Sequence, residues 1–214
     1  MEGDITKIIE GYVDAHTDDL SDLLKDLLAE TESITGRSRW SIGKVEGKML
    51  QMLIKISNTR RVVEVGTFTG FSALAMAEAL PEDGVLTTCE NSKAYADIAL
   101  RYFKKSPHGQ KIHLKLGAAL QTLGEIADNS QDFIFIDADK PSYGAYFDEA
   151  LRILRSGGII FVDNVFWRNK IFKKKVSNEN ASAIAAFNEK VNRENRVEKV
   201  MLSIRDGVYL IRKK

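Results

Sequence analysis

The chain has 214 residues, 44% of them hydrophobic and 29% charged, which is the composition of a globular protein rather than a disordered one. Its 31 Lys and Arg residues are balanced by 30 Asp and Glu, so the net charge of +1 argues against nucleic acid or an anionic membrane as partner. The single cysteine argues against an intrachain disulfide, and the acidic N-terminus argues against a signal peptide. The lack of a long apolar run argues against a membrane span. We therefore expect one cytoplasmic domain over residues 1–214.

Residues 1–56 are expected to form an N-terminal helical extension. Leucines recur at i, i+3, i+4, i+7 and i+8 from Leu20 to Leu28, which places them along one face of a helix. Gly36 and residues 37–40 interrupt the pattern, and a second helical run begins near Lys44. We expect the leucine face to pack on the chain's own core.

From residue 57 onward, short apolar runs alternate with helical stretches, which is typical of a parallel sheet covered on both faces. The apolar runs are residues 61–65, 85–89, 111–115, 133–136 and 159–162, separated by helical patterns over 71–80, 93–104, 118–127 and 143–154. A further helix is expected over 181–192. Two final runs, 197–204 and 208–211, flank Asp206-Gly207, which predicts an antiparallel hairpin. The predicted fold is α/β: a doubly wound, mostly parallel, seven-stranded sheet with an antiparallel C-terminal hairpin.

The first strand runs into a glycine-containing loop and then a helix, an arrangement that places backbone N–H groups toward a ligand. Its spacing, Gly66-x-x-x-Gly70, is not the G-x-G-x-x-G of dinucleotide sites, and no Gly-Lys-Ser/Thr of a triphosphate site follows. Glu64 at the strand end would repel a pyrophosphate but could accept a bond from an ammonium group. Glu90 ends the second strand, where a carboxylate can bind ribose hydroxyls.

These residues together favour S-adenosylmethionine as the ligand. Each has a structural alternative: a glycine loop also serves close packing, and Glu90 could instead be an acid at a helix N-terminus, where the helix dipole favours it.

Polar residues follow the fourth and fifth strands at the same sheet edge. Asp137 follows one strand, and Asp163-Asn164 follow the other, so three oxygen ligands converge there. Such ligands suit Mg²⁺, and also Ca²⁺ or Mn²⁺, rather than zinc. Each residue alone could be a helix cap or a turn former. Lys140, three residues after Asp137, is either a solvated loop charge or a general base whose ammonium form a neighbouring dication and sulfonium disfavour.

These motifs are similar to those of the cation-dependent class I O-methyltransferases, the caffeoyl-CoA and catechol O-methyltransferases and their bacterial relatives. The resemblance extends from Glu46-Gly47 to the C-terminus and rests on VVEVGTFTGFSALAMAEALPEDG, FIFIDADKPSY, GGIIFVDNVFW and the terminal DGV. It implies a Rossmann-like methyltransferase fold, transfer of a methyl group to a hydroxyl of a small catechol-like or caffeoyl-type acceptor, and a homodimer in which N-terminal helices can take part.

The resemblance also implies roles for individual residues. Asp137, Asp163 and Asn164 would bind the metal, Lys140 would be the base, and Trp167 and Arg168 would lie beside the acceptor. The implied cofactor contacts are Ile42 (through its backbone), Glu64, Gly66, Thr67, Ser72, Glu90, Ala119, Asp137 and Asp139.

Two positions depart from the family pattern. Arg168 stands where plant relatives have a small polar residue, and Arg205 replaces a smaller residue just before Asp206-Gly207. Residues 168–175 carry five positive charges and no acid, so this loop is either simply solvated or a contact for an anionic acceptor such as a CoA thioester or a carboxylated phenol.

Other classes of protein fit less well. Against a methyltransferase-fold protein that binds without turnover stand the three metal ligands and Lys140. Against an NAD-dependent oxidoreductase stands the missing G-x-G-x-x-G motif. Against a methyltransferase acting on nucleic acid or protein stand the neutral net charge, the metal ligands and the absence of an Asn-Pro-Pro-Tyr motif.

Overall fold

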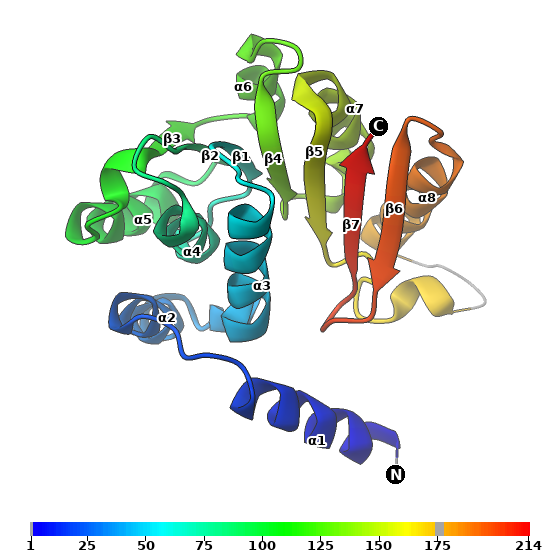
Figure 1. Ribbon diagram of the computed structural model, residues 1–214. Coiled ribbons are helices and arrows are strands. Elements are labelled where there is room, and N and C mark those ends of the chain that lie inside the picture. The colour runs from blue at the N-terminus through cyan, green and yellow to red at the C-terminus, as the bar shows by residue number, and fades with distance from the viewer. Residues whose placement is uncertain (1, 174–177) are drawn as a thin grey trace.

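The computed structural model describes residues 2–173 and 178–214 and contains one seven-stranded sheet (Figure 1). The strands lie in the order β3-β2-β1-β4-β5-β7-β6. The first five are parallel, whereas β7 runs antiparallel to both β5 and β6. This confirms the predicted doubly wound sheet with its C-terminal hairpin. The bounds are β1 (Arg61–Val65), β2 (Val85–Glu90), β3 (Ile112–Leu116), β4 (Gln131–Ile136), β5 (Leu154–Asp163), β6 (Val197–Leu202) and β7 (Val208–Lys213).

Helices cover both faces of this sheet because side chains of a strand alternate between the two faces. On β4, Phe133 and Phe135 join one apolar cluster, whereas Ile134 and Ile136 join the other. The first cluster contains residues of α2 (Asp22–Thr35), α3 (Gly43–Ile56), α4 (Phe71–Ala79) and α5 (Lys93–Lys105). The second contains residues of α6 (Ala119–Glu125), α7 (Tyr143–Ile153) and α8 (Glu179–Arg193).

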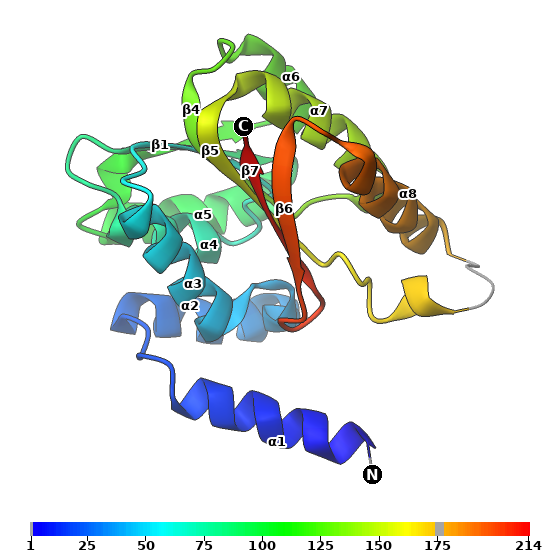
Figure 2. The same cartoon turned by 45° about the vertical axis from the view of Figure 1, so that its right-hand side comes forward.

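The N-terminal extension contains three α-helices, one more than the sequence pattern predicts. Helix α1 (Glu2–Ala15) ends before residues 16–21, and Ser21 caps α2 by accepting a hydrogen bond from the Leu24 backbone N–H. The predicted leucine face does pack on the core, since Leu24 and Leu27 are fully buried. Helix α1 instead stands apart from the body of the molecule (Figures 1 and 2).

Several strand boundaries differ from the prediction by one or two residues, and the start of β5 differs by five. Strand β5 begins at Leu154 rather than Ile159, because Gln131 pairs with Leu154 ahead of an irregularity in the ladder. The residues between carry no apolar pattern, so the sequence did not indicate them. Strand β6 ends at Leu202 rather than 204, because Gly207 N–H donates to the Ile204 carbonyl and closes a turn there.

The carboxyl ends of β1, β4 and β5 lie side by side, since Val65 pairs with Ile136 and Ile136 with Val162. The loops that follow these strands therefore meet at one edge of the sheet. Within residues 2–173 and 178–214, none of the helices is both long and apolar enough to cross a membrane.

Candidate active site

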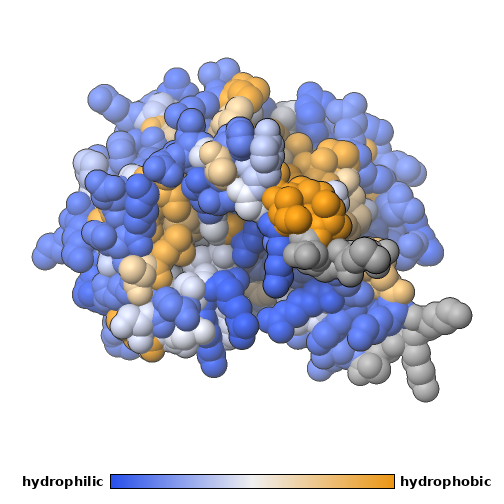
Figure 3. Space-filling view, turned by 90° about the horizontal axis from the view of Figure 1, so that it is seen from below, coloured by the Kyte–Doolittle hydropathy of each residue, from blue (hydrophilic) through white to orange (hydrophobic). Residues whose placement is uncertain are grey.

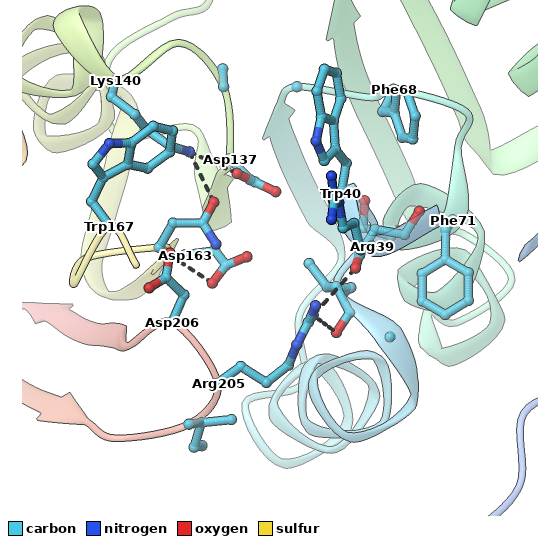
Figure 4. A pocket seen from close by; sticks show the side chains of 18 of the residues that line it. Arg39, Trp40, Phe68, Phe71, Asp137, Lys140, Asp163, Trp167, Arg205 and Asp206 are labelled. Carbon is cyan, nitrogen blue, oxygen red and sulfur yellow. Dashed lines mark hydrogen bonds and ion pairs between the residues drawn. The ribbon is translucent and has the colours of Figure 1, made fainter. Parts of the chain in front are cut away.

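A pocket of about 1750 Å³ lies at this edge of the sheet. Figure 4 shows Lys140 and Trp167 on one side of it, Arg39, Trp40, Phe68 and Phe71 on the other, and Asp137 and Asp163 between them. Almost all of the predicted site residues line it. They are Ile42, Gly66, Thr67, Ser72, Glu90, Ala119, Asp137, Asp139, Lys140, Asp163, Asn164, Trp167 and Arg168. The exception is Glu64, which is buried behind the lining.

The glycines of the β1–α4 loop are required by space as well as by conformation. Gly66 has a φ of +103°, and a Cβ there would lie 2.0 Å from the Asp137 carbonyl oxygen. Gly70 has a φ of +97°, and a Cβ there would lie 2.7 Å from the Phe103 ring. The loop can therefore approach both the β4 end and α5 only because these residues lack side chains.

Glu64 is fully buried, and its two carboxylate oxygens differ in their hydrogen bonding. Its Oε2 accepts a hydrogen bond of 2.5 Å from Thr88 Oγ1, whereas Oε1 has no partner among the described residues. Burial raises the pKa of Glu64 to about 7, against the effect of the Thr88 hydrogen bond. A buried carboxylate in this state suits a cationic ligand group that would complete its hydrogen bonding.

Glu90 is held by two backbone N–H groups. Phe68 N–H donates to Oε2 and Ser92 N–H donates to Oε1, each at 2.8 Å. The carboxylate thus joins the glycine loop to the start of α5, as the structural alternative expected. Each oxygen keeps a further lone pair, so the same carboxylate can still accept hydroxyl groups from a ligand.

An aromatic group beside Glu90 was not predicted. The rings of Trp40 and Phe68 lie 5.7 Å apart, and those of Phe68 and Tyr95 lie 4.7 Å apart. Arg37 lies 4.3 Å over the Trp40 ring and donates to the Tyr95 hydroxyl. Since these residues come from three separate segments, no local pattern links them. The only signal was that the helical pattern breaks at residues 36–40.

Lys140 lies between two of the predicted metal ligands. Its Nζ donates to Asp137 Oδ1 and Asn164 Oδ1, both at 3.0 Å, and to the Tyr143 hydroxyl at 2.5 Å. The Trp167 ring lies 5.6 Å from the same nitrogen. Only 6% of the Lys140 side chain is exposed, so it is not a solvated loop charge.

The carboxyl groups around Lys140 outnumber their cationic partners. Burial raises the pKa of Asp163 well above its usual value, and the charges of Glu46 and Asp137 raise it further. Burial likewise raises the pKa of Glu46 to about 7, although Arg205 opposes this. The ionised forms of these carboxyl groups are therefore disfavoured, and an additional cation would stabilise them.

The residues present fit a hard divalent cation. Asp137 Oδ1 and Asn164 Oδ1 already converge on one cationic nitrogen at equal distance. Among the described residues no three His, Cys, Asp or Glu side chains are grouped for a metal, so the Asn164 amide oxygen would have to serve beside the two aspartates. Asn164 adopts a φ of +60°, which turns the chain at this point.

Two further residues of the predicted set are held by defined partners. Asp139 Oδ1 accepts a hydrogen bond from the Tyr146 hydroxyl at 2.5 Å, and Arg168 N–H donates to Asp206 Oδ1 at the same distance. Arg168 and Lys170 of the predicted basic loop are described, as is Lys173, whereas Lys174 and Lys175 lie outside the described residues.

Comparisons with known proteins agree with this geometry. A family model described as O-methyltransferase matches residues 14–214. A caffeoyl-CoA O-methyltransferase of Populus kitakamiensis is 37% identical over 202 residues, which cover 89% of this chain and 86% of the relative. A "Probable caffeoyl-CoA O-methyltransferase 1" of Dictyostelium discoideum is 35% identical over 210 residues, 96% of this chain and 91% of the relative.

Solved structures are similar over nearly the full length. The O-methyltransferase of Bacillus cereus, determined in complex with SAH, superposes with a TM-score of 0.87 at 27% identity and covers 97% of each chain. The similarity thus extends to the carboxyl edge of the sheet, where the pocket lies.

Proposed function

Because the chain belongs to the O-methyltransferase family, as an S-adenosylmethionine-dependent enzyme of the caffeoyl-CoA O-methyltransferase type, we propose that it methylates a hydroxyl group of a small catechol-like or caffeoyl-type acceptor with the help of a divalent cation. The observation that carries this proposal is the position of Lys140, whose Nζ lies 3.0 Å from both Asp137 and Asn164 within the pocket. The proposed base and the proposed cation ligands therefore lie together in the pocket.

The cofactor is proposed to lie along the β1–α4 loop. Glu64, with its unpartnered Oε1, would accept the cofactor's ammonium group, and Glu90 would accept its ribose hydroxyls. The aromatic group of Trp40, Phe68 and Tyr95 lies beside Glu90 and offers apolar surface to the cofactor. Ile42, Gly66, Thr67, Ser72, Ala119, Asp137 and Asp139 complete the proposed cofactor contacts.

Asp137, Asp163 and Asn164 would hold the cation, with Mg²⁺ favoured and Ca²⁺ or Mn²⁺ as alternatives. When bound, it would act as a Lewis acid that lowers the energy of a deprotonated acceptor hydroxyl. The excess of buried carboxyl groups at this position supports the assignment.

Lys140 is proposed to remove the proton of the acceptor hydroxyl. The O–H bond breaks as the proton passes to a neutral Lys140 Nζ, and the resulting oxyanion attacks the methyl carbon of the sulfonium. The carbon–sulfur bond then breaks and S-adenosylhomocysteine leaves. The hydrogen bonds to Tyr143 and Asn164 hold Nζ in place, 5.6 Å from the Trp167 ring.

Arg168 and the basic loop support an acceptor that carries a negative charge. Arg168 lines the pocket with its backbone fixed by Asp206, so its side chain is available at the rim. Comparing caffeoyl-CoA, caffeate and uncharged catechol as acceptors tests this point. A lower KM for the anionic acceptors, lost in Arg168→Met, is expected, and equal KM values for all three would contradict it.

A homodimer through α1 is also proposed. Helix α1 exposes apolar side chains that its own chain leaves uncovered: Ile5 is 52%, Ile8 62% and Tyr12 65% exposed. The view from the side of α1 shows apolar side chains gathered on this face (Figure 3). A patch of this kind is typical of an interaction surface.

The experiment that tests the proposed reaction is product analysis by mass spectrometry with S-adenosylmethionine and a panel of catechols, caffeoyl compounds and flavonoids, with and without Mg²⁺. Gain of one methyl group on an ortho-dihydroxy acceptor is expected. Calorimetric binding of S-adenosylmethionine without methylation of any acceptor would instead favour a binding protein without turnover.

A further inference from the structure

Arg205 lies on the turn between β6 and β7 and reaches a distant segment of the chain. Its Nη1 donates to Glu46 Oε2 at 2.5 Å, to the Ser41 carbonyl at 3.2 Å and to the Ile42 carbonyl. Figure 4 shows the side chain extending from the turn to the start of α3. One guanidinium group therefore joins two segments about 160 residues apart in the sequence.

The Arg205–Glu46 ion pair lies partly in the interior of the protein. Glu46 is fully buried, whereas 39% of the Arg205 side chain remains exposed. A buried carboxylate that loses its cationic partner is left uncompensated, which is far more costly than losing a surface ion pair. Gly43, the first residue of α3, lies beside the guanidinium and has a φ of +73°, a conformation that glycine adopts without strain.

The same turn is also attached to the opposite side of the pocket. Val165 N–H donates to the Gly207 carbonyl at 3.1 Å, and Phe166 N–H donates to the Asp206 carbonyl at 2.8 Å. The Arg168 N–H bond to Asp206 Oδ1 adds a third connection. Gly207 packs so closely on Phe166 that a Cβ would lie 2.6 Å from the ring.

The turn thus connects the two walls of the pocket. One wall is the segment 163–168, with Asp163, Asn164 and Trp167, and the other is the segment 39–46, with Trp40 and Ile42. The turn itself, residues 203–206, lines the pocket between them. The first wall is held by two backbone bonds and by the Asp206 carboxylate, whereas among the described residues the hydrogen bonds from the turn to the second wall all come from the Arg205 side chain.

We propose that Arg205 is a positioning residue for the acceptor: by joining the β6–β7 turn to the Trp40 segment it sets the separation of the two pocket walls. This inference rests on the proposed function, because the walls matter only if an acceptor binds between them. Without the guanidinium at this position the Trp40 wall would lose its hydrogen bonds to the turn, so acceptors of different size would be distinguished less sharply.

The test compares Arg205→Met and Arg205→Lys with a matched control, Arg212→Met. Arg212 lies on β7 and, among the described residues, forms one ion pair, with Glu198; both side chains are more than half exposed. Hydrogen exchange of the Trp40 and Ser41 amides measures the attachment of the wall. Acceptor KM, kcat and the calorimetric Kd for S-adenosylmethionine measure its consequence.

In Arg205→Met these amides should exchange about tenfold faster and the acceptor KM should rise by about tenfold, since small misplacements of a bound group are costly. The Kd for the cofactor should change less than about threefold, because Trp40 and Ile42 are only two of its many proposed contacts. In Arg205→Lys the exchange rates and the acceptor KM should lie between those of Arg205→Met and those of the wild type, because lysine keeps the charge but not the planar group of donors. Arg212→Met should match the wild type.

Unchanged exchange and unchanged acceptor KM in Arg205→Met would overturn the proposal, as would a cofactor Kd that rises as much as the acceptor KM. If Arg205→Met does not fold, amide exchange and acceptor KM are compared between Arg205→Lys and the wild type. Wild-type values of both in Arg205→Lys would then overturn the proposal. A wild-type enzyme that methylates no acceptor would instead refute the proposed function, and the exchange measurement would still test the attachment.

Discussion

Lys140 Nζ lies within hydrogen-bonding distance of Asp137, Tyr143 and Asn164, so its position is set before any acceptor arrives. Asp137 and Asn164, on either side of it, are proposed cation ligands. A cation bound there would compete with Lys140 for the same oxygens and leave the amine directed at the acceptor. The base and the cation site are therefore not two independent features of the pocket.

Replacing Lys140 with Ala should lower kcat by about 100-fold or more, the usual contribution of a general base. The Kd for S-adenosylmethionine should stay close to the wild-type value, because Lys140 is not itself among the proposed cofactor contacts. Steady-state kinetics and calorimetry measure the two effects. Lys93→Ala is the control, since Lys93 forms an exposed pair with Asp97 away from the pocket. A loss of cofactor affinity equal to the loss of turnover would contradict the role of a base.

Glu64 should make cofactor binding depend on pH. Its pKa in the free enzyme is raised to about 7 by burial, so the carboxyl is protonated below that pH and ionised above it. A cofactor ammonium favours the ionised form, so binding must release the proton and weakens as pH falls. The Kd should increase by about tenfold from pH 7.5 to pH 6.

Glu64→Gln removes the titrating group while keeping a hydrogen-bond acceptor. Its Kd should be larger than that of the wild type and nearly constant over the same pH range, as measured by calorimetry. The same pH dependence in both proteins would show that another group is responsible.

Single residues at strand ends were the most predictable part of the site. Asp137, Asp163 and Asn164 follow apolar strands directly, so their meeting at one edge follows from parallel strand order alone. The contact of Arg205 with Glu46 could not be predicted, because it depends on the conformation of a turn and on a segment outside the sheet. The aromatic group of Trp40, Phe68 and Tyr95 was missed for the same reason.

At the scale of elements, the β1–α4 loop depends on the absence of side chains. Gly66→Ala should lower the free energy of unfolding by about 2 kcal/mol or more, because its Cβ would overlap the Asp137 carbonyl and its positive φ would be strained. Chemical denaturation measures this change.

Gly124→Ala, on α6, is the matched control. Nothing lies within 4 Å of a Cβ at Gly124, so alanine there should be neutral or stabilising by about 0.5–1 kcal/mol. Equal stability of the two variants would contradict the close approach of the loop to β4.

The elements themselves followed from the sequence wherever apolar residues were continuous. All seven strands and the helices between them were predicted, but the start of β5 was not, because polar residues and glycines fill its first half. The separation of α1 from α2 was also missed, since both are helical and the break between them is set by the Ser21 cap and packing on the core.

At the scale of the whole molecule, α1 is the element least attached to its own chain. Changing Ile5 and Ile8 to Glu should convert the proposed dimer to a monomer, because charges would then lie on the apolar face that the partner covers. Size-exclusion chromatography with light scattering measures the molar mass of each variant in solution. Exchanging Glu10 for Gln, on the same helix, is the control, and a dimer that persists in the double variant would exclude α1 as the interface.

The arrangement of the whole chain brings the proposed cofactor loop from β1, the proposed cation ligands from β4 and β5, and the proposed acceptor wall from the N-terminal extension to one pocket.

Methylation of an ortho-dihydroxy acceptor after metal removal measures the proposed reaction most directly. The enzyme is treated with EDTA, freed of chelator, and assayed with S-adenosylmethionine before and after addition of Mg²⁺. Loss of the methylated product after treatment and its return with Mg²⁺ are expected. Full activity of the metal-free enzyme would contradict the role assigned to Asp137, Asp163 and Asn164.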